Sequence, residues 1–149
     1  PAPTWPAWAL LATIGAWVAV IDAITTWIPA VLAWTGWAGW IGAVVVTALS
    51  DHTAAIRAVI ATAIIFAAWM IAWLISRGGF GFSDVRITPL WAAPVAATGI
   101  DTIHATVIAG LTLIALYALI DRFRHHTTRF LPWAPSLCSG ALIGLAIAH

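Results

Sequence analysis

Long apolar runs separated by short polar segments dominate this chain. A helix that crosses the hydrocarbon core of a bilayer needs about 20 largely apolar residues. Four runs come close to or exceed that length, and each ends in polar residues: 5–21, 27–49, 58–75 and 102–120. Because backbone polar groups in lipid need internal partners, each run predicts a membrane-spanning helix.

Two further apolar segments are shorter. The segment 87–100 contains Pro89 and Pro94 and predicts a short or half-buried helix. The segment 131–148 predicts another helix, whose start is set by Pro132 and Pro135. No linker separates these segments, so we expect one all-α membrane domain over 1–149 with about six transmembrane helices.

The composition supports this interpretation. Hydrophobic residues make up 63% of the chain and charged residues 7%, and Lys, Glu, Asn and Gln are absent. In a typical soluble domain roughly a quarter of the residues are charged. The sequence therefore excludes a soluble globular enzyme, a disordered chain and a nucleic-acid binder with a basic face. The lipid bilayer is the first partner to expect.

The arginines predict the orientation. With six crossings, one side of the membrane receives five of them: Arg77, Arg86, Arg122, Arg124 and Arg129. Only Arg57 falls on the other side. Basic residues are in excess in cytoplasmic loops, so the five mark the cytoplasmic side of the cell inner (plasma) membrane. Both termini are then expected outside.

Tryptophan is abundant, with 11 copies, and predicts two kinds of position. Five copies lie near expected segment ends, where indole rings favour the membrane interface: Trp5, Trp8, Trp27, Trp91 and Trp133. Three more step by three residues within one run: Trp34, Trp37 and Trp40. We expect these three to form a packing face, with an aromatic substrate site as the alternative.

Ionisable residues at membrane depth are functional candidates, and the five aspartates differ in their positions along the chain. Asp51 and Asp101 lie at expected outer helix ends and predict N-caps. Asp121 closes a helix beside Arg122 and Arg124 and is expected to pair with them. Asp22 and Asp84 remain. The single cysteine, Cys138, excludes an intrachain disulfide and is expected to pack in a helix.

Asp22 and Asp84 lie on separate segments at the expected cytoplasmic end. Two carboxylates held close together share a proton, so that one can activate water while the other polarises a scissile carbonyl. Asp84 follows a glycine-rich turn in which Gly79 and Gly81 allow a sharp bend. The alternative is that both aspartates only cap helices. The nearby sequence offers no set of metal ligands, and we expect neither a metal nor an organic cofactor.

Three ordered segments resemble motifs of the type IV prepilin peptidases, which are membrane aspartyl proteases of the GxGD class. The sequence GFGFSDVRI at 79–87 resembles the family's GxGxGDVKL, and DAITTWIP at 22–29 resembles its D-x-x-T-x-x-I-P. The segment LPWAPSLCSG at 131–140 resembles its closing I-P-F-x-P-x-L-x-x-G. The resemblance covers essentially the whole chain.

The resemblance implies a GxGD-type helical bundle in which Asp22 and Asp84 are the catalytic pair. It also implies an active-site loop that includes Gly79, Gly81 and Ser83. The substrate would be a type IV pilin-like precursor, cleaved after its leader peptide at the cytoplasmic face. N-methylation of the new terminus accompanies an additional N-terminal portion in this family, and we do not predict it here.

The chain departs from the family pattern at two positions. Ser83 replaces the glycine before the second aspartate, where it either restricts the turn or hydrogen-bonds Asp84 and lowers its pKa. Arg86 replaces a lysine and is expected at the membrane interface, with an active-site role second. A degenerate, non-catalytic member is therefore the alternative, and a small transporter using Asp101 and His104 is another.

The paired histidines His125 and His126 lie in a basic segment. We expect them in a loop that touches anionic lipid headgroups. A metal site is the weaker alternative, because the segment lacks carboxylate or cysteine partners.

Overall fold

A computed structural model describes residues 5–76, 81–125 and 133–148, with the side chains at 124, 125 and 148 excepted. All regular secondary structure within these residues is helical, without a strand. The elements are α1 (Trp5–Leu10), the π-helical turn η1 (Leu11–Gly15), α2 (Ala16–Thr25), α3 (Ala30–Ser50), α4 (His52–Ser76), α5 (Phe82–Arg86), α6 (Thr88–Thr98), α7 (Ile100–His125) and α8 (Trp133–Ala148).

Four helices in the described part of the chain are long and apolar enough to cross a membrane: Trp5–Thr25, Ala30–Ser50, His52–Ser76 and Ile100–Phe123. A helix of 21 residues is about 31 Å long, which matches the thickness of a hydrocarbon core. Their outward faces carry exposed Ile, Val, Leu and Trp side chains, such as Ile64, Leu74 and Ile108. The architecture fits an all-α, multi-pass membrane protein.

The third span is longer than the apolar run predicted. It begins at His52 rather than at residue 58, because Asp51 caps it: the Asp51 Oδ1 atom accepts a hydrogen bond of 2.9 Å from the backbone N–H of Ala54. The expected cap is confirmed. The expected cap at Asp101 is wrong, because Gly99 precedes α7 and Asp101 lies inside its first turn.

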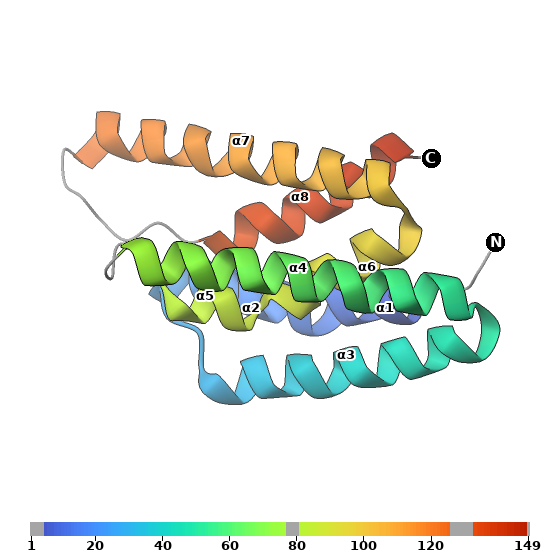
Figure 1. The fold of residues 1–149 in the computed structure, drawn as a ribbon. Helices are drawn as coiled ribbons and strands as arrows, with labels where there is room; N and C mark the ends of the chain where they lie inside the picture. The colour runs from blue at the N-terminus through green and yellow to red at the C-terminus, as the bar shows by residue number, and fades with distance from the viewer. Residues whose placement is uncertain (1–4, 77–80, 126–132, 149) are drawn as a thin grey trace.

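Successive segments run in alternating directions (Figure 1). The left-hand end in that view collects the end of α2, the start of α3, the end of α4, α5, the end of α7 and the start of α8. The opposite end holds the α3–α4 and α6–α7 connections. We call the first of these the aspartate end, because α2 and α5 carry Asp22 and Asp84.

Helix α6 forms the centre of the molecule. It contacts α1, η1, α3, α4, α5, α7 and α8, and its residues 88–97 are all buried. The sequence predicted a half-buried helix here, with Trp91 at the interface. Trp91 instead is 1% exposed and packs in the core with Leu137 and Val95. A helix that is apolar on every side is suited to this position.

Helices α7 and α8 pack closely because glycines line the contact. A Cβ atom added to Gly140 would lie 2.7 Å from the Gly110 backbone nitrogen and 2.8 Å from its Cα. One added to Gly144 would lie 2.9 Å from the Thr106 nitrogen. Small residues four apart allow this approach of two backbones, as in membrane helix pairs generally. The tight pair fixes α8, whose first turn reaches the aspartate end.

The first span contains a π-helical turn. The backbone N–H of Ala16 bonds the carbonyl of Leu11, five residues earlier, and the Thr13 hydroxyl donates to the Ala9 carbonyl at 2.7 Å. The thiol of Cys138 lies 3.8 Å from the Gly15 carbonyl. Cys138 is buried, so the expected packing role is confirmed.

Candidate active site

Asp22 lies in the last turn of α2 and is 3% exposed. The helix ends because Thr26 adopts a left-handed conformation (φ 52°), from which its N–H bonds the Asp22 carbonyl at 2.8 Å. The Thr25 hydroxyl lies 2.8 Å from the Ile21 carbonyl and 2.9 Å from that of Trp27. The segment 22–29 thus forms a closed turn that keeps the Asp22 side chain inward.

Asp84 lies in the first turn of the short helix α5 and is 5% exposed. Its N–H bonds the carbonyl of Gly81 at 3.2 Å. A Cβ atom added to Gly81 would lie 2.9 Å from Asp84 Oδ2 and 3.1 Å from the Ser83 hydroxyl oxygen. The absence of a side chain at Gly81 therefore leaves room for the carboxylate. Gly79, the other glycine of the predicted loop, lies outside the described residues.

One apolar cluster joins the segments that carry the two aspartates. We call it the site floor, and its buried members are Leu10, Val18, Ile28, Ile87, Leu90 and Ala134. Val18 lies one turn before Asp22, and Ile87 lies three residues after Asp84. Packing of the site floor therefore holds α2 and the α5–α6 connection against each other. The floor also includes Ala134, at the start of α8.

Helix α8 donates a hydrogen bond to Asp22. The backbone N–H of Ala134 lies 3.0 Å from Asp22 Oδ2, and the two residues are 112 positions apart in sequence. An N–H in the first turn of a helix has no partner within the helix, so it is available to a carboxylate. The sequence gives no sign of this contact, because a backbone donor leaves no mark in the residue pattern.

The electrostatics of Asp84 differ from those of an ordinary carboxyl group. Two causes together raise the pKa of Asp84 from 3.8 to about 7: burial, which is the larger, and the negative charge of Asp22. The second cause places the two carboxylates within electrostatic range. The alternative in which Ser83 hydrogen-bonds Asp84 and lowers its pKa is wrong, because the pKa is raised and no such bond forms. Near neutral pH the Asp84 carboxyl group is therefore about half protonated.

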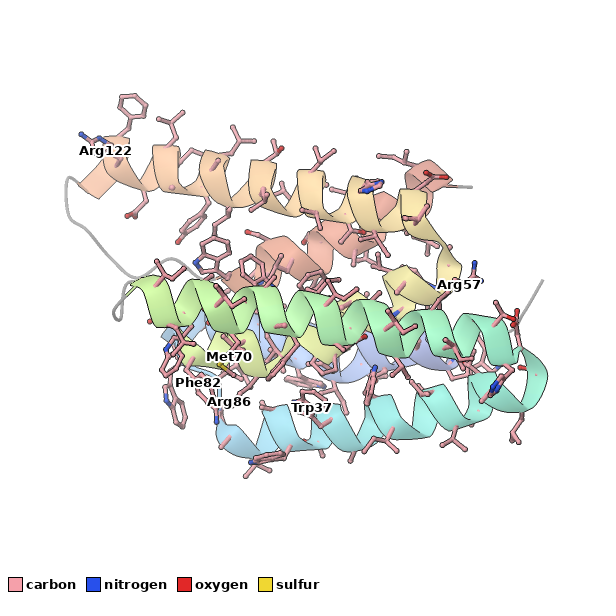
Figure 2. The ribbon with its side chains drawn as sticks, viewed as in Figure 1. Trp37, Arg57, Met70, Phe82, Arg86 and Arg122 are labelled. Carbon is pink, nitrogen blue, oxygen red and sulfur yellow. The ribbon has the colours of Figure 1, made fainter. Side chains whose placement is uncertain are left out.

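Arg86 lies at the aspartate end but does not pair with a described aspartate. Its guanidinium lies 5.5 Å from the centre of the Phe82 ring, and Figure 2 shows the two side chains next to each other. Its backbone carbonyl accepts a 3.0 Å hydrogen bond from Trp37 Nε1. This bond ties α5 to α3, which is a role the sequence did not predict.

The predicted tryptophan face is only partly formed. Trp37 and Trp40 meet edge to face, with ring centroids 5.5 Å apart, and Trp37 also meets Phe66 at 5.6 Å. The prediction that Trp34 belongs to this packing face is wrong, because its side chain is 67% exposed. An exposed indole on a long apolar helix is suited to lipid contact.

The remaining ionisable residues form no further cluster in the described part of the chain. Asp101 and His104 are both exposed, and no hydrogen bond joins them, which gives the transporter alternative no support. Among the described side chains, no ion pair joins Asp121 to Arg122, and the expected pairing with Arg124 falls on a side chain that is not described. The described residues hold no group of three His, Cys, Asp or Glu side chains placed to bind a metal. His126 lies outside them, and the side chain of His125 is not described.

Comparison with known proteins leaves the family open. No protein-family model matches the sequence, no curated protein matches it, and no solved structure matches the fold.

Proposed function

We propose that this protein is a membrane aspartic endopeptidase that removes the leader peptide of type IV pilin-like precursors at the cytoplasmic membrane face. The observation that carries the proposal is the placement of two buried aspartates, from α2 and α5, within electrostatic range of each other at one end of a helical bundle. The motifs around Asp22, Asp84 and the start of α8 occur in the same order as in the GxGD-type prepilin peptidases. On this resemblance we propose that the protein belongs to that family and has about six membrane segments.

The two carboxylates have different surroundings, and this suggests their roles. Asp84 has the raised pKa and supplies the protonated carboxyl group, which polarises the scissile carbonyl. Asp22 accepts the Ala134 N–H and supplies the carboxylate, which takes a proton from the attacking water. The water oxygen adds to the carbonyl carbon, the peptide C–N bond breaks, and the leaving amine takes up the proton that Asp22 received from the water. No metal ion is needed for this sequence of steps.

The arginines support a cytoplasmic position for the aspartate end. Arg86 and Arg122 lie at that end and Arg57 at the other (Figure 2). Arg77 and Arg129 lie outside the described residues, and the side chain of Arg124 is not described. Basic residues favour the cytoplasmic side, which is also the side where a pilin leader would meet the enzyme.

The test is cleavage of a co-expressed pilin-like precursor in membranes that contain the wild type or a variant. Asp22→Asn and Asp84→Asn should each reduce leader cleavage by about 10²- to 10⁴-fold, the usual contribution of a general acid or base. Asp101→Asn is the matched control, because this exposed aspartate lies at the opposite end. Cleavage at the wild-type rate by either buried-aspartate variant rules out the proposed pair.

Ser83 favours the alternative of a degenerate member that binds precursors without cleaving them. The Ser83 hydroxyl oxygen lies 3.1 Å from the position that a Cβ atom on Gly81 would take, next to the Asp84 carboxylate. Ser83→Gly distinguishes the two cases in the same assay. An active enzyme changes little, whereas an impaired one gains cleavage that still depends on Asp22 and Asp84.

A further inference from the structure

An apolar groove opens between α4, α6 and α7, far from the two aspartates. Its volume is about 360 Å³, and its lining comes from one face of α4, from Ala96 of α6, and from Ile100, Ile103 and His104 of α7. Residues 57, 60, 61, 64 and 65 form one stripe along α4. The groove therefore runs along the first half of this membrane-spanning helix.

The polar groups of the groove all lie at its outer end. Arg57 comes five residues after the start of α4, and His104 four residues after the start of α7. At about 1.5 Å per residue, both lie about 6–8 Å inside the helix ends, which is the depth of lipid headgroups. Figure 2 shows Arg57 near the start of α7. Ile64 and Ile65 lie about 10–12 Å deeper.

The groove is open toward the lipid. The side chains of Ile60 and Ile64 on one wall are 54% and 64% exposed, and Ile100 on the other is 68% exposed. Ala61 and Ala96 also line the groove, and their small side chains leave space between its walls. An occupant can therefore enter sideways from a bilayer without any rearrangement of the helices.

The dimensions distinguish between a helix and an acyl chain. A helix about 10 Å across has a cross-section of about 80 Å², so the groove would hold only about 5 Å of its length. A hydrocarbon chain is much thinner and fits the same volume lengthwise. The guanidinium of Arg57 and an imidazole N–H of His104 then meet the group at the top of the chain, where a phosphate accepts both donors.

We propose that this groove is a binding site for an anionic phospholipid, with one acyl chain between α4 and α7 and the headgroup phosphate at Arg57 and His104. The site lies in the leaflet opposite the aspartate end. It depends on the helix packing and not on the activity of Asp22 and Asp84, so it stands or falls independently of the proposed function.

The experiment uses the full chain in vesicles of phosphatidylcholine that contain a trace of photoactivatable phosphatidylglycerol, with the reactive group on the acyl chain. Labelled peptides are identified by mass spectrometry. Labelling is expected on the stretch 60–65 and on Ile103. Ala61→Phe fills the groove and should remove this labelling. Ala63→Phe is the matched control, because Ala63 is exposed on the same helix and does not line the groove.

The charge contribution is tested separately with Arg57→Gln. The preference for phosphatidylglycerol over photoactivatable phosphatidylcholine should fall about fivefold, the contribution of one basic group at an anionic surface. Arg122→Gln, at the other end of the bundle, should leave it unchanged. Equal labelling in the Ala61→Phe and Ala63→Phe proteins refutes an acyl-chain site. An unchanged preference in Arg57→Gln refutes the headgroup assignment.

Discussion

Replacement of the buried carboxyl group in Asp84→Asn should stabilise the protein at high pH, and the sign follows from the direction of its pKa shift. The pKa of Asp84 is about 7 in the folded protein against 3.8 in an exposed chain. Between these values the folded state holds a proton that the unfolded state has released. The free energy of unfolding therefore falls as pH rises from about 4 to about 7 and levels off above that. Asparagine cannot ionise, so the free energy of unfolding of the variant does not fall with pH for this reason.

The size of the effect follows from the same shift. A difference of about 3 pKa units, at 1.36 kcal/mol per unit, gives an upper limit of about 4 kcal/mol between acid and alkaline conditions. The buried amide of asparagine adds a cost of about 1–3 kcal/mol if it finds no partner. That cost is independent of pH. The change in the stability difference with pH therefore isolates the carboxyl group.

The assay is denaturant unfolding of the purified protein in detergent micelles at pH 4, 5.5, 7 and 8. The stability of Asp84→Asn relative to the wild type should rise across this series, most steeply between pH 4 and 7. Asp101→Asn is the control, because this carboxylate is exposed to solvent. In Asp22→Asn the pKa of Asp84 should fall only part of the way to 3.8, since burial is the larger cause. A stability difference that is the same at pH 4 and pH 8 contradicts the reasoning.

Three further predictions concern other parts of the molecule. Asp51→Ala removes the hydrogen bond to the Ala54 N–H and should lower the free energy of unfolding by about 0.5–2 kcal/mol in the same assay, whereas Asp51→Asn should restore most of it. Gly140→Val pushes α8 away from Gly110 and should destabilise the protein by more than Gly140→Ala does; equal unfolding midpoints for the two variants contradict this packing. If Asp84 acts as the protonated carboxyl group, leader cleavage should decline above about pH 7, because the group then loses its proton; a rate that stays constant from pH 7 to 9 excludes that role.

Local features of the structure could be predicted from the sequence. The long apolar runs correspond to the long helices, and Asp51 caps α4 because an N-cap needs only the side chain and the N–H three residues later. The motif at 22–29 forms a turn for the same reason, since its hydrogen bonds join near neighbours. Asp22 and Asp84 were predicted at one end of the bundle, and both lie there.

Features that depend on tertiary contacts could not be predicted. Hydropathy cannot distinguish a helix that faces lipid from one that faces protein, so α6 and Trp91 were expected nearer the surface than they are. The Ala134 N–H that bonds Asp22 is a backbone group and could belong to any residue type. The packing of α8 on α7, α2 and α6 brings it there.

Because of the π-helical turn in the first span, a one-residue deletion should have different effects before and after the end of that turn. A π-helical turn holds one residue more than the α-helical turn it replaces. Loss of one residue within η1 can therefore restore regular α-helix and leave Asp22 facing the site floor. Loss of one residue within α2, between the turn and Asp22, instead rotates the carboxylate by about 100° relative to the preceding turns. We expect deletion of Thr13 to preserve leader cleavage and deletion of Ala19 to abolish it, so that indels in natural variants of this span should be confined to the first half of the helix.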